Sequence, residues 1–303
     1  MIYTVTLNPS VDYHIWLSSF SEGETHVVER EAKMAGGKGI NVSIVLKQLG
    51  MESKALGFLG GFTGEFIRME LNAKGVSHDF IPVAGDTRIN MKLKTAHETE
   101  CNGISPQIPE EAAAKLLKQL QALTAEDSLV LAGSMPSSLP QYFYRQIIEQ
   151  AAAKGVTVFL DSKGEALHQA IPARPFLIKP NHHELGDLFC VQIETPDEAI
   201  PYAKKLVEQG AQNVIVSLAG RGAIFTDGHV TYVAQVPKGE VVNSVGAGDS
   251  TVAGFLYQWQ KTGDKLQAFR YGLASGSATA FHEGFCTPES IEELLPQVQI
   301  TQK

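Results

Sequence analysis

The stretch SLVLAGSMPSSLPQYFYRQIIEQAAAKGVTVFL, residues 128–160, contains the pattern that decides the fold. Residues 128–131 form a short apolar run, residues 141–154 repeat apolar side chains with a helical period, and residues 156–160 form a second apolar run. Strands that are apolar on both faces and are joined through a helix are typical of a parallel sheet covered on both sides. This stretch therefore predicts a strand–helix–strand unit of an α/β protein.

The same alternation extends outward on both sides of this stretch. We expect further strands at residues 3–7, 176–178 and 214–217, and a helix at residues 198–209. The regions 11–33 and 87–100 break the rhythm, because polar and apolar residues alternate there as in half-buried antiparallel strands. We predict one α/β domain over residues 1–303, with a small β-sheet lid formed by about 11–33 and 87–100 inserted in it.

The composition limits the classes of function. Of the 303 residues, 44% are hydrophobic and 19% are charged, so a large core is available. The net charge of −8 argues against a general binder of nucleic acids or of anionic membranes. The three cysteines lack metal-binding spacing, no secretory leader opens the sequence, and no apolar run approaches the length of a membrane span. We expect a cytoplasmic protein that acts on a small molecule.

Two glycine-rich turns each precede a helix. The first, Gly246-Ala247-Gly248, leads into a helical stripe of apolar residues that begins at Val252. The backbone N–H groups at such a helix start attract anions, and Asp249 lies where the anion would bind. Two interpretations of Asp249 remain open here: a helix-capping residue, or a general base that takes a proton from an attacking hydroxyl group.

The second turn, Gly36-Gly37-Lys38-Gly39, is followed by Asn41 and by an apolar helical stripe. A tight turn with a solvated lysine would account for it, but such a run of glycines costs backbone entropy unless some group must approach closely. Neither turn is a P-loop, and no dinucleotide fingerprint follows the first strand, so we expect neither a P-loop site nor a dehydrogenase.

Polar residues also follow two later strands. Asn181 and Glu184 have the spacing of a helix capping box, and they could instead organise a hydrated Mg²⁺ near phosphates. Ser217 precedes the turn 220–222 at a strand end, where open α/β sheets bind ligands, although a plain tight turn is equally compatible. His182 and His183 have no third ligand nearby, so we predict surface or supporting residues rather than a zinc site.

The region of the expected lid contains further candidate ligands. Alternation places Arg88 and Asn90 on one face of a strand. The guanidinium group could hold a phosphate through two hydrogen bonds, although an isolated arginine on an exposed strand is more often solvated. Asp12 could be a turn residue or could bind a hydroxyl group at the end of the first strand.

Together these motifs resemble those of the PfkB carbohydrate kinases, the ribokinase-like family. Residues 36–43, with the glycines at 50, 60, 61 and 64, are similar to its first signature, and residues 243–250 to its second. The resemblance covers essentially the whole chain. It implies a three-layer α/β sandwich with a mainly parallel central sheet and a small β-sheet lid. The lid strands could also pair across a homodimer, since exposed strand edges often need covering.

The resemblance implies an activity as well. The segments TLNPSVD (6–12) and TRIN (87–90) and the two glycine motifs are most similar to the branch that phosphorylates fructose 1-phosphate. That branch transfers a phosphoryl group from ATP, with Mg²⁺, directly to the 6-hydroxyl, giving fructose 1,6-bisphosphate. Tagatose-6-phosphate kinases share the opening and the GGKG turn and are the alternative. A non-catalytic sugar-phosphate sensor would keep the GGKG turn but would not need Asp249.

The resemblance further assigns roles to individual residues. Asp249 would be the general base, and the amides of Ala247, Gly248 and Asp249, in the turn that begins at Gly246, would form the anion hole. The nucleotide would be bound by Lys179, Asn181, Glu184, Ser217, Gly220, Arg221 and Gly222, with Glu184 holding Mg²⁺ through water. The sugar phosphate would be bound by Asp12, Gly37, Lys38, Asn41, Arg88, Asn90 and Ser134. Ala219 departs from the family, which usually has glycine at this position.

Overall fold

The computed structural model describes residues 1–303 and is built on one large sheet. The strand order is β15-β14-β13-β12-β11-β10-β9-β1-β4-β5, and β6 also pairs with β4. The strands are β1 Ile2–Thr6, β4 Ser53–Leu59, β5 Ser77–His78, β6 Ile81–Pro82, β9 Ser128–Ala132, β10 Thr157–Asp161, β11 Leu177–Ile178, β12 Val214–Ser217, β13 Ala223–Thr226, β14 Thr231–Gln235 and β15 Gln299–Gln302. Neighbouring strands are parallel from β5 to β12, and β13 to β15 continue the sheet antiparallel.

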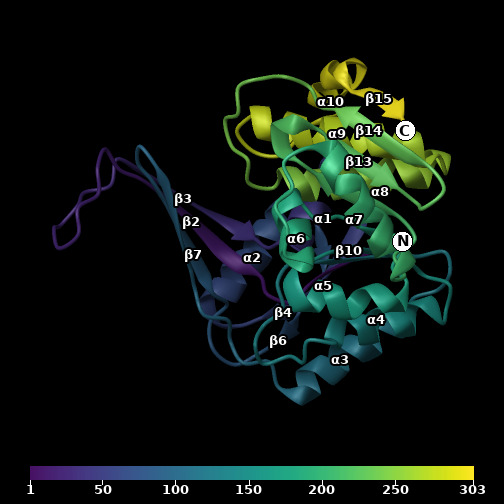
Figure 1. The fold of residues 1–303 in the computed structure, drawn as a ribbon. Coiled ribbons are helices and arrows are strands. Elements are labelled where there is room, and N and C mark those ends of the chain that lie inside the picture. Colours follow the sequence, from purple (N-terminus) through teal and green to yellow (C-terminus); the bar gives the residue numbers. More distant parts are fainter.

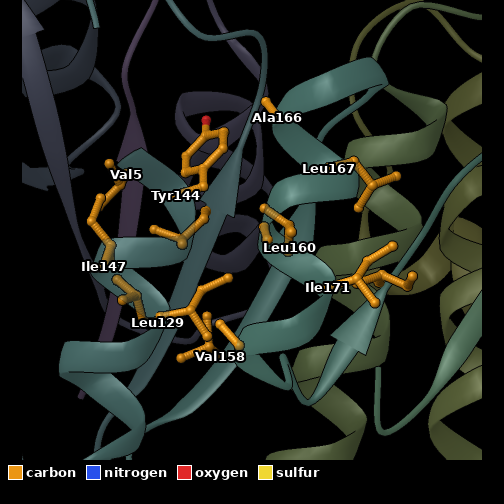
Figure 2. Packing of buried hydrophobic residues seen from close by; sticks show 14 of the residues in the cluster. Val5, Leu129, Tyr144, Ile147, Val158, Leu160, Ala166, Leu167 and Ile171 are labelled. Atoms are coloured by element: carbon orange, nitrogen blue, oxygen red, sulfur yellow. The ribbon is translucent and has the colours of Figure 1, made fainter. Parts of the chain in front are cut away.

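The apolar runs of the central strands supply two cores, one on each face of the sheet. In β9, Leu129 and Leu131 face one core, whereas Val130 and Ala132 face the other. Figure 2 shows part of the first core, where strand residues such as Leu129 and Leu160 meet side chains of the covering helices such as Ile147. Burial on both faces explains why these strands are continuously apolar.

Helices cover both faces of the sheet. One core is covered by α3 Glu110–Leu120, α4 Phe143–Ala152, α5 Gly164–Ala170, α6 His182–Phe189 and α7 Pro196–Glu208. The other is covered by α1 Lys38–Gln48, α8 Ala247–Thr262, α9 Lys265–Phe281 and α10 Pro288–Leu294. Helix α2 Gly61–Ala73 packs with α1 and β4 in a third, smaller cluster. The predicted α/β class with a mainly parallel sheet is confirmed.

A second, four-stranded sheet has the order β3-β2-β7-β8 and stands out from the main body in Figure 1. Its strands are β2 Ser10–Trp16, β3 Arg30–Gly36, β7 Ile89–Lys94 and β8 Glu98–Asn102. The sequence correctly predicts a separate small sheet, but the expectation that all its strands pair antiparallel is wrong. The β2–β3 and β7–β8 pairs are antiparallel, whereas β2 and β7, which join the two segments at the centre, are parallel.

The other local expectations differ from the structure mostly at element ends. The strand predicted at 214–217 is found as β12, and the strands at 128–131 and 156–160 are found within a residue as β9 and β10. Within the alternating region 87–100, residues 91–100 (MKLKTAHETE) belong to a hairpin, because residues 95–97 bend the chain between β7 and β8. None of the helices combines the length and the apolar character that crossing a bilayer requires.

Candidate active site

The first turn of α8 contains the carboxylate of Asp249, which is 5% exposed. Gly246, the N-cap residue directly before α8, has φ 82°, and a Cβ atom there would lie 2.4 Å from the Phe285 ring, so only glycine fits. Asp249 accepts one hydrogen bond, from the Asn41 side chain (Nδ2–Oδ2 2.8 Å), and caps no backbone amide. The interpretation as a helix-capping residue is therefore wrong, and the amides of Gly248 and Asp249 have no backbone partner and stay free for another anion.

The electrostatic surroundings of Asp249 suit a base. Burial raises the pKa of this carboxyl group to about 6, and the charge of Asp161 raises it further, against the opposing effects of Lys38, Asn41 and Lys179. A carboxylate with such a pKa is ionised at neutral pH and still basic enough to accept a proton. The burial and the proton affinity of Asp249 therefore suit the predicted role of a general base.

Helix α1 begins at Lys38, directly after a constrained glycine. Gly37 has φ 121°, and a Cβ atom there would lie 2.7 Å from Cγ2 of Thr6 in β1. This close approach to β1 explains why position 37 is glycine, whereas the sequence alone shows only that the glycine costs backbone entropy. The interpretation of Lys38 as a solvated lysine is wrong, because its ammonium group lies 3.0 Å from Oδ1 of Asp161.

Asp161, the last residue of β10, is a site residue that sequence reasoning missed. Its carboxylate is 1% exposed and lies between two lysines, with Oδ2 3.5 Å from Nζ of Lys179. Against its burial, the ammonium groups of Lys179 and Lys38 hold the pKa of Asp161 below its ordinary value. The available signal was an aspartate at the carboxyl end of a buried parallel strand, the edge where α/β sheets bind ligands.

A second group of predicted residues gathers where the lid meets β1. Asp12 on β2 accepts hydrogen bonds from Ser10 (2.7 Å) and from Asn90 of β7 (3.3 Å). Arg88, just before β7, donates to the backbone carbonyl of Asn8 (3.2 Å). The side chain of Asn8, also missed from the sequence, donates to Ser134 (3.1 Å). The parallel pairing of β2 with β7 thus brings Asp12, Arg88 and Asn90 together.

Arg88 has an unused hydrogen-bonding group that points to an anionic ligand. Its Nε atom is buried and has no hydrogen-bond partner. Burial lowers the pKa of the guanidinium group, and Asp12 opposes this effect. A buried donor left unpaired is costly, so a phosphate oxygen at this position would satisfy it. The structure places Lys38 with Lys179 and Asp161 rather than with Arg88.

The segment between β11 and α6 has the capping box. Oδ1 of Asn181 accepts from the Glu184 amide and Oε2 of Glu184 accepts from the Asn181 amide, both at 2.9 Å. Glu184 also lines an open cleft of about 380 Å³ together with Ser134, Lys163 and Asp187. A carboxylate beside a polar cleft offers the oxygen ligands that Mg²⁺ prefers, so the donor chemistry fits a hydrated Mg²⁺. The assignment of Mg²⁺ to Glu184 stays a prediction.

The predicted nucleotide loop follows β12. Ser217 pairs with Asn181 across the sheet edge, and the short turn Ala219–Arg221 is exposed. Ala219 has φ 51°, a left-handed conformation that glycine adopts without strain, so its departure from the family pattern costs conformational energy. Gly220 and Gly222 lie in the same turn.

Of the two predictions for His182, a surface or a supporting residue, the structure favours the second. Its side chain is buried, and Nε2 lies 2.6 Å from the Arg221 guanidinium group. Burial lowers the pKa of His182, and the neighbouring charges of His183 and Arg221 act in the same direction. His182 therefore ties the start of α6 to the turn after β12.

Comparison with known proteins places the chain among sugar kinases. The model of the pfkB family of carbohydrate kinases matches residues 5–292. The chain is 53% identical over 301 residues to 1-phosphofructokinase of Bacillus subtilis, with 99% of each chain covered. It is 43% identical over 302 residues to 1-phosphofructokinase of Borreliella burgdorferi, with 99% of this chain and 98% of the relative covered. D-tagatose-1-phosphate kinase of Bacillus licheniformis is more distant, at 33% identity over 302 residues and 99% of both.

Solved structures share the fold over their full length. Phosphofructokinase-2 from Escherichia coli, in complex with potassium, matches with a TM-score of 0.91 at 27% identity, covering 98% of each chain. A Staphylococcus aureus protein solved as a candidate phosphofructokinase matches with a TM-score of 0.87 at 44% identity. That match covers 100% of this chain and 99% of the other.

Proposed function

The chain belongs to the pfkB family of carbohydrate kinases, and we propose that it transfers the terminal phosphoryl group of ATP to the 6-hydroxyl of fructose 1-phosphate. The product is fructose 1,6-bisphosphate. The observation that carries this proposal is the buried Asp249 carboxylate at the start of α8, held by Asn41 and flanked by two lysines. The 53% identity to a 1-phosphofructokinase supports the choice of acceptor.

The chemical step needs a base and a site for the charge that develops on the phosphoryl group. Asp249 takes the proton as the 6-hydroxyl oxygen attacks phosphorus in line with the leaving ADP oxygen. The amides of Ala247, Gly248 and Asp249 at the start of α8 stabilise the equatorial oxygens, because preorganised donors act strongly in a water-poor site. Those of Gly248 and Asp249 have no backbone partner, and that of Ala247 makes only a long bond of 3.3 Å to the Ser244 carbonyl. Lys38 and Lys179, which lie together beside this turn, neutralise the negative charge. No covalent enzyme intermediate is required.

The acceptor is held on the lid side of the site. Arg88 binds the phosphate group of the sugar, since its unpaired Nε donor lies near Asp12 and Asn90. Asp12 and Asn90 bind sugar hydroxyl groups, together with Gly37, Asn41 and Ser134. Closure of the lid would exclude water and limit the hydrolysis of ATP.

Sugar kinases of the pfkB family use ATP, generally with Mg²⁺. In this chain Glu184 would hold the ion through water, and Asn181, Ser217, Gly220, Arg221 and Gly222 would border the nucleotide. When bound, Mg²⁺ neutralises charge on the ATP phosphates and orients them. Lys179 reaches the phosphates from the end of β11, next to the same turn of α8.

An assay of ADP release tests the proposal directly. Fructose 1-phosphate should support the fastest release among fructose 1-phosphate, tagatose 6-phosphate, fructose 6-phosphate and unphosphorylated sugars. Preference for tagatose 6-phosphate would transfer the assignment to the tagatose kinases. No release with any of them would favour a non-catalytic sugar-phosphate sensor.

The pKa of Asp249 sets the expected pH dependence. Because the base must be ionised, kcat/KM should fall as the pH drops through about 6, by tenfold for each pH unit well below that value. The measurement is the initial rate at low sugar-phosphate concentration between pH 5 and 8, with the coupling enzymes in excess at each pH. A rate that stays constant down to pH 5 would contradict the role of Asp249.

We further propose that the chain is one cytoplasmic domain that forms a homodimer through its lid. The edges of the lid sheet, β3 and β8, are mostly exposed, and Ile89 and Met91 expose apolar side chains on β7. Pairing of two lids would cover these edges and side chains. Sedimentation equilibrium distinguishes a dimer from a monomer of 32.8 kDa.

A further inference from the structure

We propose that Asp161 is a positioning residue that holds the ammonium groups of Lys38 and Lys179 together at the start of α8, where they meet the transferring phosphoryl group. This inference rests on the proposed function, because it concerns the same phosphoryl-transfer step. Asp161 itself does not need to contact either substrate.

The geometry places one buried carboxylate between two lysines from different parts of the fold. Lys38 begins α1, and Lys179 follows β11. Their Nζ atoms lie 3.0 Å and 3.5 Å from the two different oxygens of Asp161. The backbone carbonyl of Asp161 accepts a hydrogen bond from the Gly133 amide (2.9 Å), which fixes the residue at the carboxyl end of β10. Asp161 therefore fixes the positions of the ammonium groups of two flexible lysine side chains.

The position of Lys179 requires such an anion. A Cβ atom on Gly248 would lie 3.1 Å from Nζ of Lys179, so this ammonium group lies directly over the first turn of α8. The N-terminus of a helix carries a partial positive charge and repels cations. A lysine at this place is stable only if a nearby anion compensates, and Asp161 supplies that anion in the absence of a phosphate.

The charge of the group also suits its task. Two ammonium groups and one carboxylate leave one net positive charge, which balances the ionised Asp249 beside them, so the two lysines neither face each other unshielded nor leave the base as an uncompensated negative charge. The Oδ2 atom of Asp161 makes no hydrogen bond, although Lys179 lies at ion-pair distance. Lys179 is thus held near the site while its hydrogen-bond donors remain free for phosphate oxygens.

The test is the neutral, isosteric substitution Asp161→Asn. Without the carboxylate, the two ammonium groups should separate, and kcat should fall about 10- to 100-fold, the loss expected for a hydrogen bond to a charged group. Asp227→Asn is the matched control, because Asp227 pairs with Lys265 at the same 3.0 Å distance away from the site. It should leave kcat within about twofold.

Two further readouts separate positioning from a merely structural role. In a Lys38→Met background, Asp161→Asn should cost less than in the wild-type protein, because one of the two lysines that it positions is already absent. The acid limb of kcat/KM should also move, because the pKa of Asp249 depends on the charge of Asp161, which raises it, and on the ammonium groups of Lys38 and Lys179, which lower it. A general loss of structure would produce neither change.

The affinity for MgATP, measured by calorimetry without any sugar, tests the inference independently of which sugar phosphate is the acceptor. Asp161→Asn should weaken it about tenfold or more through the misplaced Lys179. If the wild-type protein phosphorylates no sugar phosphate, the proposed function fails, and this affinity still tests Asp161. Unchanged MgATP affinity together with unchanged kcat and an unchanged acid limb of kcat/KM would overturn the inference.

Should Asp161→Asn not fold, Asp161→Glu is the second variant, because it keeps the charge but displaces both ammonium groups. Wild-type kcat and MgATP affinity in Asp161→Glu would also overturn the inference.

Discussion

Replacement of Asp249 by asparagine should lower kcat by about 10²- to 10⁴-fold while the fold stays intact. Asparagine has the same shape and can still accept the hydrogen bond from Asn41, but it cannot take the proton of the attacking hydroxyl group. Substrate affinity should change much less, because the amides of the α8 turn and the lysines remain. The measurements are steady-state kinetics and the affinity for fructose 1-phosphate by calorimetry.

The same variant should be at least as stable as the wild-type protein at pH 7.5. The folded pKa of Asp249, about 6, lies above the ordinary 3.8, so this group favours folding below about pH 4 and loses that contribution as the pH rises through 6. At pH 7.5 the ionised carboxylate is buried at a cost that asparagine avoids. Thermal unfolding of both proteins at pH 7.5 checks whether the Tm of Asp249→Asn is equal to or higher than that of the wild-type protein.

Asp264→Asn is a suitable control for Asp249→Asn. Asp264 caps α9 by accepting from the amides of Leu266 and Gln267, and asparagine caps helices equally well. It should keep both activity and stability. Turnover of Asp249→Asn near the wild-type value, with this control also active, would contradict a catalytic base at position 249.

Replacement of Arg88 by alanine should raise KM for fructose 1-phosphate about 10- to 100-fold and leave KM for ATP unchanged. Charge-assisted hydrogen bonds to phosphate are about twice as strong as neutral ones, and Arg88 has a buried Nε donor that the protein itself leaves unpaired. Initial rates with each substrate varied in turn separate the two constants.

Arg145→Ala controls for the loss of an arginine as such. Arg145 is exposed on α4 and pairs with Glu149 of the same helix, so its removal should change neither constant. An equal rise in KM for both substrates of Arg88→Ala would show that Arg88 supports the lid generally instead of binding the sugar phosphate.

The fold class followed from the sequence because strands such as β9 are buried on both faces and so leave a continuous apolar run. The pairing of β2 with β7 did not follow, because alternation gives the face of each side chain and not the direction of its neighbour. The hairpin within 87–100 did not follow either, because the residues of its turn, 95–97, continue the alternation of the two flanking strands.

The candidate site was predictable where residues cluster along the chain. The glycine turns mark the starts of α1 and α8, so Lys38 and Asp249 could be chosen from local sequence. Asp161 and Asn8 could not, because their meaning depends on partners more than a hundred residues away. His182 and Arg221 are 39 residues apart and meet only because of the sheet, so local sequence leaves the surface and the supporting interpretation of His182 open.

The hydrogen bond between Asn41 and Asp249 joins residues 208 positions apart, and the Lys38–Asp161 contact spans 123. Contacts of such long range form late in folding, because the intervening chain must first be ordered. Every strand of the main sheet except β15 precedes α8 in the chain and is therefore synthesised before it. Phosphoryl transfer by this protein therefore requires that synthesis has passed α8. A truncated or partly folded copy can bury much of its core and still lack the base Asp249.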